Sequence, residues 1–203
     1  MRGNSHDYVC IAGKNMCGIN FLKFLLKKIP KEKILACPNK KDNGKDDWQL
    51  SFKKFAKSSN IKIVKLEKLY NIKNLIFISI EYEQLININL FRSKKLFNFH
   101  FSLLPKYRGC HTNFYQVFNG EKYSGVTLHK IDNGIDTGPI GAKIRFKINP
   151  KDTAKDNYLK LMKYSVKLFK NKFKNLLNNN IVFKKQNLQN GSYFSRKSIN
   201  YSK

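Results

Sequence analysis

The 203-residue chain lacks the long apolar run that a membrane protein would need. Its longest strongly apolar stretch, residues 75–80, is far shorter than the roughly 20 residues of a membrane-spanning helix. The amino terminus runs into a strand-like segment at residues 8–11 and shows no secretory signal. These absences predict a cytoplasmic protein with no membrane partner.

Cysteine is scarce, and the motifs of common cofactor sites are missing. The four cysteines, at positions 10, 17, 37 and 110, show no C-x-x-C spacing, so we expect free thiols in a reducing compartment and no metal site. The loop at residues 13–18 lacks both G-x-G-x-x-G and G-x-x-x-x-G-K-[ST]. It still lies between a strand and a helix, where backbone N–H groups can bind an anion, so Lys14 and Asn15 are candidate ligand contacts.

Acidic residues are few, with 13 Asp and Glu against 40 Lys and Arg, and the formal net charge is +27. A basic surface attracts nucleic acid and other anions. However, only five of the basic residues are arginine, and no recognisable nucleic-acid-binding module is visible. We interpret the charge as compositional or as a general attraction for anions. A basic nucleic-acid-binding protein remains the lower-ranked alternative.

The order of apolar segments favours an α/β fold. Strands are predicted at residues 7–12, 33–37, 61–64 and 75–80. Helices are predicted at residues 19–26, at 47–56 with Leu50, Phe52 and Phe55 facing inward, and at 153–177. This alternation is typical of a Rossmann-like, mostly parallel sheet with flanking helices. We expect one catalytic domain over residues 1–180 and a short extension over 181–203 that forms a hairpin or an arm.

Residues 97–103 read as a strand with an unusual polar face. Three phenylalanines alternate with Asn98, His100 and Ser102, so the polar side chains share one side. Burying unpaired polar groups costs about 1–3 kcal/mol each, which suggests a functional reason for them. A chain-breaking loop follows at residues 104–109, and ligands of open α/β sheets bind at such strand ends.

A second polar segment follows the strand-like run at residues 126–131. The loop at residues 132–138 contains two glycines and an asparagine, which permit tight turns, and it carries Asp136. A carboxylate beside an imidazole raises the basicity of the ring and fixes its tautomer. Asn98, His100 and Asp136 therefore form a candidate proton-handling trio, whereas His129 is interpreted as structural.

The segments N-F-H-F-S-L-L-P-K-Y-R-G, N-G-E, G-V-T-L-H and D-N-G-I-D-T-G, in this order, closely resemble the folate-dependent formyltransferase family. The resemblance implies that Asn98, His100 and Asp136 are the catalytic set and that 10-formyltetrahydrofolate is the formyl donor. It also implies a formyltransferase fold and a pterin slot whose expected residues are Ile80, Glu81, Tyr82, Leu104, Ile131, Asp132 and Gly134.

Three further segments, residues 11–15, 37–49 and 191–197, look most like the branch of this family that acts on sugars. The implied reaction is transfer of a formyl group to the amine of a dTDP- or UDP-linked amino-dideoxysugar by a homodimer. Residues 109–112 instead resemble the glycinamide ribonucleotide branch, so that formyltransferase is the alternative. The chain ends before the separate carboxyl-terminal domain of a methionyl-tRNA formyltransferase, and we do not expect that acceptor. Candidate acceptor contacts are Lys14, Asn15, Tyr107, Arg108, His111 and Thr112.

Overall fold

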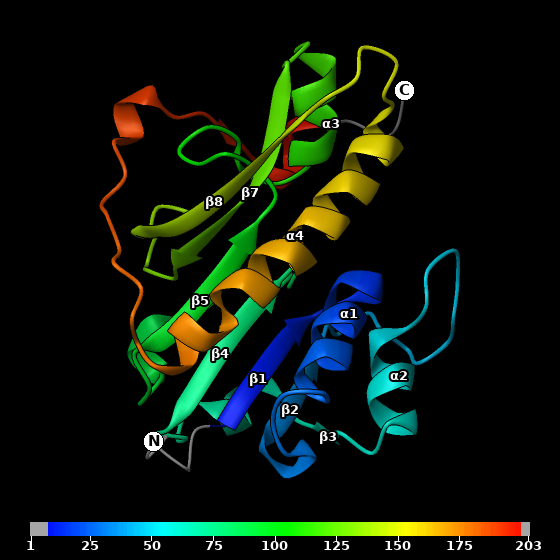
Figure 1. The fold of residues 1–203 in the computed structure, drawn as a ribbon, viewed down its shortest axis with the longest axis vertical. Coiled ribbons are helices and arrows are strands. Elements are labelled where there is room, and N and C mark those ends of the chain that lie inside the picture. Colours follow the sequence, from blue (N-terminus) through cyan, green and yellow to red (C-terminus); the bar gives the residue numbers. More distant parts are fainter. Residues whose placement is uncertain (1–7, 200–203) are drawn as a thin grey trace. The chain divides into compact units, whose positions relative to one another are not determined.

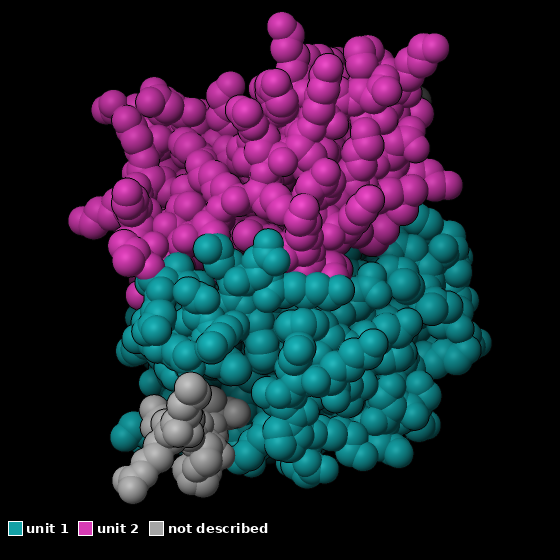
Figure 2. All heavy atoms as spheres, in the orientation of Figure 1, with its two compact units in different colours: residues 1–99, 169–181 teal, residues 100–168, 182–203 magenta. Residues whose placement is uncertain are grey.

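The computed structural model describes residues 8–199, which form two compact units (Figure 2). Unit 1 contains residues 8–99 and 169–181, and unit 2 contains residues 100–168 and 182–199. The strand order is β3-β2-β1-β4-β5-β7-β8 in a seven-stranded sheet, and β6-β9 form a separate two-stranded ladder. The mostly parallel α/β fold is therefore confirmed.

Unit 1 is the parallel part of the fold (Figure 1). Its elements are β1 (Tyr8–Gly13), α1 (Asn15–Leu25), β2 (Ile34–Pro38), α2 (Phe52–Ser58), β3 (Lys62–Ile63), β4 (Leu75–Ile80) and β5 (Lys95–His100), whose last residue begins unit 2. Every pairing among these strands is parallel. All six residues of β4 are buried, which explains its continuous apolar sequence, because a parallel strand is covered on both faces.

Stacked phenylalanines hold the helices of unit 1 against its sheet. The rings of Phe21 on α1 and Phe169 on α4 (Ala154–Leu177) are parallel, with centroids 4.1 Å apart. Phe99 of β5 meets both rings edge-on, at 5.2 and 5.7 Å. One face of β5 is thus fixed by aromatic packing, and the polar residues that alternate with Phe97 and Phe99 are left on the other face.

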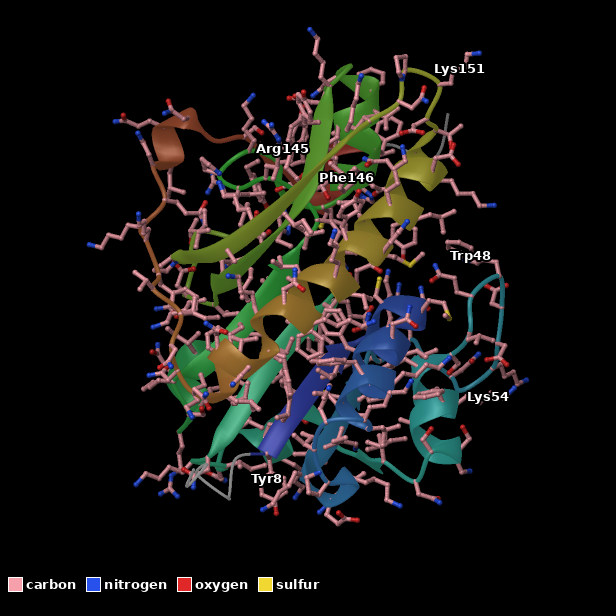
Figure 3. The ribbon with its side chains drawn as sticks, viewed as in Figure 1. Tyr8, Trp48, Lys54, Arg145, Phe146 and Lys151 are labelled. Carbon is pink, nitrogen blue, oxygen red and sulfur yellow. The ribbon has the colours of Figure 1, made fainter. Side chains whose placement is uncertain are left out.

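Unit 2 contains β6 (Arg108–Gly109), α3 (Thr112–Phe118), β7 (Tyr123–Lys130), β8 (Ile140–Lys147) and β9 (Tyr193–Phe194). Strands β7 and β8 are antiparallel, and β8 was not predicted from the sequence. Arg145 and Phe146, labelled in Figure 3, are consecutive residues of β8, so their side chains lie on opposite faces of the strand. Arg145 lies over the ring of Tyr123, and Phe146 stacks on Tyr164 of α4.

Several predicted boundaries are wrong. The helix expected at residues 47–56 begins at Phe52, because Ser51 caps it by accepting a hydrogen bond from the N–H of Lys54. Leu50 therefore lies outside the helix and is 45% exposed rather than buried. Helix α1 begins at Asn15 rather than residue 19, and β5 ends at His100, so Ser102 is not on the strand.

The carboxyl-terminal extension contributes the strand β9 within the described residues. Its β9 pairs in parallel with β6, whereas a hairpin would pair two neighbouring segments of the extension. Of the extension, residues 200–203, including Tyr201, lie outside the described part. Short 3-10 helices occur at Lys31–Lys33, Leu66–Leu69, Ile88–Leu90, Leu188–Asn190 and Arg196–Ser198.

Cys10, Cys37 and Cys110 carry free thiols, as predicted. Burial raises the pKa of the Cys37 thiol to about 11, and it also raises the pKa of Cys10. Within residues 8–199, none of the helices combines the length and apolar character that a membrane crossing requires.

Candidate active site

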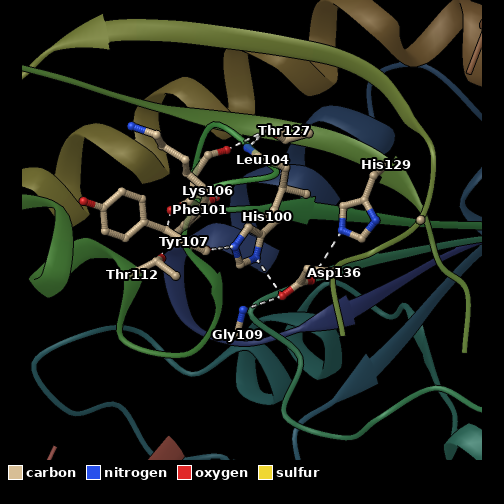
Figure 4. A network of polar contacts seen from close by, with 12 residues as sticks. His100, Phe101, Leu104, Lys106, Tyr107, Gly109, Thr112, Thr127, His129 and Asp136 are labelled. Atoms are coloured by element: carbon tan, nitrogen blue, oxygen red, sulfur yellow. Dashed lines mark hydrogen bonds and ion pairs between the residues drawn. The ribbon is translucent and has the colours of Figure 1, made fainter. Parts of the chain in front are cut away.

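His100 ends β5 and is the centre of a buried polar network (Figure 4). Its ring nitrogen Nε2 lies 2.7 Å from the carbonyl oxygen of Tyr107, and Nδ1 lies 3.4 Å from Oδ2 of Asp136. A carbonyl oxygen can only accept a hydrogen bond, so Nε2 carries the hydrogen. In the neutral ring the lone pair is therefore on Nδ1, the nitrogen that faces the carboxylate.

Asp136 brings a carboxylate to this imidazole from the loop between β7 and β8. Its side chain is only 12% exposed, and its backbone is left-handed, with φ of 55°. Oδ2 accepts a hydrogen bond from the N–H of Gly109 at 2.9 Å, and Oδ1 lies 3.4 Å from Nε2 of His129. Burial opposes the ionised form, but the two imidazoles and the N–H of Gly109 outweigh it, so the pKa of Asp136 is below its usual value.

His129 is the member of this network that the sequence analysis did not foresee. It lies on β7, is 2% exposed, and its Nδ1 is 2.7 Å from the carbonyl oxygen of Lys130. In both histidines, one ring nitrogen thus lies next to a backbone carbonyl and the other faces Asp136. The sequence contained one signal for this, since His129 lies near the end of its strand, shortly before the loop that carries Asp136.

The electrostatics suit proton transfer near neutral pH. Burial lowers the pKa of His100, and the charge of Asp136 offsets part of that effect. The imidazole is therefore mostly a neutral base at pH 7, and the ionised carboxylate beside it stabilises a proton that arrives on Nδ1. The 3.4 Å separation is longer than an ordinary N–H···O bond, so Nδ1 is not locked to Asp136.

Tyr107 shapes the loop that faces His100. Its backbone is left-handed, with φ of 58°, and its N–H donates to Oγ of Ser192 at 2.8 Å. Its hydroxyl donates to Glu121 and accepts from Asn119. Tyr107 thus contributes its backbone carbonyl to the network. A contact between its side chain and the substrate that accepts the formyl group stays a prediction.

The other acceptor contacts predicted in unit 2 lie close to this loop. Thr112 is buried and donates its hydroxyl hydrogen to the carbonyl of Phe101 at 2.8 Å. Nε of Arg108 is buried and has no hydrogen-bond partner. Nε2 of His111 lies 3.3 Å from the carbonyl oxygen of Arg196. Their contact with a ligand remains a prediction.

The loop that follows β7 contains three of the predicted pterin contacts, namely Ile131, Asp132 and Gly134. Oδ1 of Asp132 accepts hydrogen bonds from the N–H of Gly134 at 3.2 Å and from the hydroxyl of Thr137 at 2.8 Å. These bonds fix the shape of the loop. Leu104, predicted for the same slot, is fully buried, and its N–H donates to Thr127.

Unit 1 holds the remaining predicted residues at the carboxyl ends of its strands. Gly13 of β1 and Ile80 of β4 are in register, so Lys14 and Asn15 follow one strand end while Glu81 and Tyr82 follow its neighbour. Asn39 fixes the second of these segments by donating to the carbonyl of Glu81 and accepting from the N–H of Glu83. The hydroxyl of Tyr82 lies 3.3 Å from Sγ of Cys37.

Asn98 lies opposite Ser79 in the β4–β5 register, two residues before His100. The strand therefore projects Asn98 and His100 from the same face. The structure thus brings His100 and Asp136 together within unit 2, and it places Asn98 in unit 1 on the same strand face as His100. Within residues 8–199, no three His, Cys, Asp or Glu residues are grouped as metal ligands.

The chain is similar to known formyl transferases. Residues 30–172, more than half of the chain, match the family model described as formyl transferase. A methionyl-tRNA formyltransferase of Clostridium tetani is 31% identical over 187 residues, which cover 86% of this chain and 60% of that protein. The bifunctional polymyxin resistance protein ArnA of Wigglesworthia glossinidia brevipalpis is 38% identical over 57% of this chain and 18% of its own length. The chain thus spans less than two thirds of either relative.

Two solved structures are more similar. WlaRD, a sugar 3N-formyl transferase crystallised with dTDP and 5-N-formyl-THF, is 49% identical with a TM-score of 0.92, covering 96% of this chain and 71% of that one. The N-formyltransferase of Helicobacter canadensis, in complex with folinic acid and dTDP-3-aminofucose, is 44% identical with a TM-score of 0.93, covering 96% and 73%. A phosphoribosylglycinamide formyltransferase of Bacillus halodurans, at 22% identity and a TM-score of 0.62, shares the fold.

Proposed function

The chain belongs to the formyl transferase family, and on this premise we propose that it transfers a formyl group from 10-formyltetrahydrofolate to the amine of a dTDP-linked amino-dideoxysugar. The observation that supports this best is the 49% identity to a sugar 3N-formyl transferase over 96% of the chain. The 3-amino position is favoured, because the Helicobacter canadensis structure holds dTDP-3-aminofucose.

Each unit, taken by itself, contains residues that fit a folate donor. In unit 1, Asn39 holds the Glu81 segment, and Leu85 nearby in sequence is 79% exposed. In unit 2, Asp132 holds its loop, and Ile135 on that loop is 38% exposed. Fixed backbone polar groups beside solvent-facing apolar side chains are what a flat, polar-edged pterin requires. When bound, the donor supplies an electrophilic formyl carbon attached to a nitrogen leaving group.

His100 is proposed as the group that takes the proton of the acceptor amine. An amine attacks only as the free base, so a proton must leave it as the new bond forms. The lone pair on Nδ1 of His100 can receive this proton, because the lowered pKa keeps the ring neutral at pH 7. Asp136, 3.4 Å away, stabilises the imidazolium that results, and this proton would then pass to the leaving nitrogen, so that proton loss and gain balance.

Asn98 is proposed to stabilise the negative charge that grows on the formyl oxygen. A side-chain amide N–H is a suitable donor for this charge, and one such donor is worth about 2.7–4 kcal/mol in the transition state. Asn98 lies two residues before His100 on β5, and alternation along a strand directs the two side chains to the same side.

Methionyl-tRNA is the second candidate acceptor. Two observations favour it: the curated relatives include methionyl-tRNA formyltransferases, and a net charge of +27 suits a polyanionic acceptor. The higher identity to the sugar enzymes, and coverage of 96% of this chain against 86%, rank the sugar first.

The test is an acceptor panel with 10-formyltetrahydrofolate as donor. The panel contains dTDP-3-amino, dTDP-4-amino and UDP-amino sugars, glycinamide ribonucleotide and methionyl-tRNA, and each product is weighed for the gain of one formyl group. We expect the gain on a dTDP-3-amino sugar, and we expect His100→Gln to abolish it. A gain on methionyl-tRNA or glycinamide ribonucleotide alone would overturn the sugar assignment.

A further inference from the structure

The arm of unit 2 contacts both loops that build the His100–Asp136 pair. We call residues 184–194 the strap. Near its start, Lys184 forms a backbone bridge with Ile140, and near its end β9 pairs with β6. Between these points the strap reaches the loop that carries Asp136 and the loop that carries Tyr107. The strap lies beyond residues 30–172, which match the family model.

Gln186 binds the loop that carries Asp136. Its Nε2 donates to the carbonyl oxygens of Asp136 and Gly138, at 2.9 and 2.7 Å. Both partners are acceptors, so the amide orientation is fixed, because the opposite orientation would place Oε1 against two carbonyls. A left-handed backbone costs about 1–2 kcal/mol for a residue with a Cβ, and Asp136 adopts one with φ of 55°. Gln186 thus fixes the backbone of the carboxylate-bearing residue through its carbonyl group.

Ser192 and β9 bind the loop on the other side of the imidazole. Oγ of Ser192 accepts the N–H of Tyr107, which is also left-handed and whose carbonyl binds Nε2 of His100. The carbonyl of Ser192 accepts the N–H of Arg108 at 2.9 Å. The ladder between β6 and β9 then sets Gly109, whose N–H donates to Asp136.

From these contacts we infer that Gln186 and Ser192 are positioning residues, which set the distance between His100 and Asp136 by clamping the loops on either side of them. Gln186 binds Asp136, a member of the pair, and Ser192 binds Tyr107, whose carbonyl contacts His100; both bound residues have a left-handed backbone. Gln186 and Ser192 therefore act on proton transfer through the geometry of the two loops that they bind. This inference rests on the proposed function for its catalytic consequence, whereas its structural part stands on the strap contacts alone.

The test compares Gln186→Leu with Gln189→Leu in the full chain. Gln189 is a matched control, because it is an exposed glutamine of the same strap, three residues beyond Gln186. Two measurements are made on each variant: the pKa of His100, from NMR of histidine labelled with ¹³C and assigned through His100→Gln, and formyl transfer as a function of pH. The NMR titration needs no turnover, so it distinguishes failure of this inference from failure of the proposed function.

We expect Gln186→Leu to lower the pKa of His100, because a displaced Asp136 no longer favours the imidazolium. The acidic limb of the kcat/KM profile then moves to lower pH, and kcat falls at least about 10-fold with little change in the KM of the acceptor, since geometry rather than binding is lost. Gln189→Leu should match the wild type in both measurements. A lower unfolding temperature with the same pKa of His100 and the same profile would mean that the strap only stabilises the fold, and would overturn the inference.

Ser192 supplies an independent pair of variants if Gln186→Leu does not fold. Ser192→Ala removes the acceptor for the N–H of Tyr107, whereas Ser192→Thr keeps a hydroxyl at the same place. We expect a changed His100 titration in the alanine variant and recovery in the threonine variant. Equal titrations in the wild type and Ser192→Ala would contradict a positioning role for Ser192.

Discussion

At the scale of single residues, the site depends on one carboxylate shared by two imidazoles. Asp136 faces His100 with one oxygen and His129 with the other, and both distances are 3.4 Å. Each ring directs its second nitrogen to a backbone carbonyl, which fixes which nitrogen faces the carboxylate. The carboxylate is therefore the group whose loss should disturb the whole network.

Replacement of the carboxylate by an amide tests this dependence. We expect Asp136→Asn to lower kcat by about 10²-fold or more, because a positioned proton-transfer group typically contributes about 10²–10⁴-fold. The same change should lower the pKa of His100, since it removes the charge that favours the imidazolium. The measurements are steady-state kinetics and an NMR titration of the histidines. Asp47→Asn, at an exposed position, is the control, and a variant at Asp136 with wild-type kcat would contradict the proposed role.

The same two groups predict how stability depends on pH. The pKa of His100 is lower in the folded chain than its usual value of 6.5, so the unfolded chain binds more protons below that pH. Stability should therefore fall as the pH drops from 6.5 toward the folded pKa of His100. The pKa of Asp136 is also lowered in the folded chain, so stability should fall further as the pH drops below 3.8, the usual pKa of this group.

Urea unfolding at about pH 7 and about pH 5 measures the first of these effects. The wild type should lose more free energy of unfolding between the two pH values than His100→Gln does. Equal losses in the two proteins would show that His100 does not contribute to the pH dependence.

At the scale of elements, the pairing of β6 with β9 leaves no room for a side chain at Gly109. Gly109 has φ of +91°, and a Cβ at this position would collide with the carbonyl oxygen of Phe194 on β9. Two independent features therefore disfavour a side chain at this position: the backbone conformation and the neighbouring strand.

We expect Gly109→Ala to destabilise the fold by more than the roughly 1–2 kcal/mol that a left-handed alanine costs, because the strand must also move. Gly120→Ala is the matched control, since Gly120 has φ of +64° and nothing within 4 Å of the added Cβ. Denaturant unfolding of both variants gives the difference. Equal destabilisation would mean that the strand contact with Phe194 does not limit the loop.

At the scale of the whole molecule, the charge of +27 governs long-range attraction and not the chemistry at His100. Affinity for a generic nucleic acid should fall steeply between about 50 and 200 mM salt, because binding releases counterions. The kcat for a dTDP-linked acceptor should change little over this range, since buried pairs such as His100–Asp136 are weakly screened. Fluorescence titration with an oligonucleotide and parallel kinetics test this. Salt-insensitive nucleic-acid binding would instead favour a specific nucleic-acid site.

Much of this architecture was predictable because its signals are local. The strand at residues 75–80 was predicted with the observed bounds, since a continuous apolar run is what a strand buried on both faces requires. The helix expected at residues 153–177 differs from α4 by one residue. By contrast, Leu50 was placed in a helix because its periodicity fits one, whereas the cap at Ser51 delays the start of that helix.

The sequence by itself determined the family motifs, the alternating α/β order and the choice of His100 and Asp136, because residue types and periodicity are properties of the chain alone. Only the tertiary structure decided that His129 shares the carboxylate and that Gln186 and Ser192 hold the loops. Gln186 lies 50 residues from Asp136, and Ser192 lies 85 from Tyr107. No periodicity spans such separations, since contacts of this kind depend on the path that the folded chain takes through space.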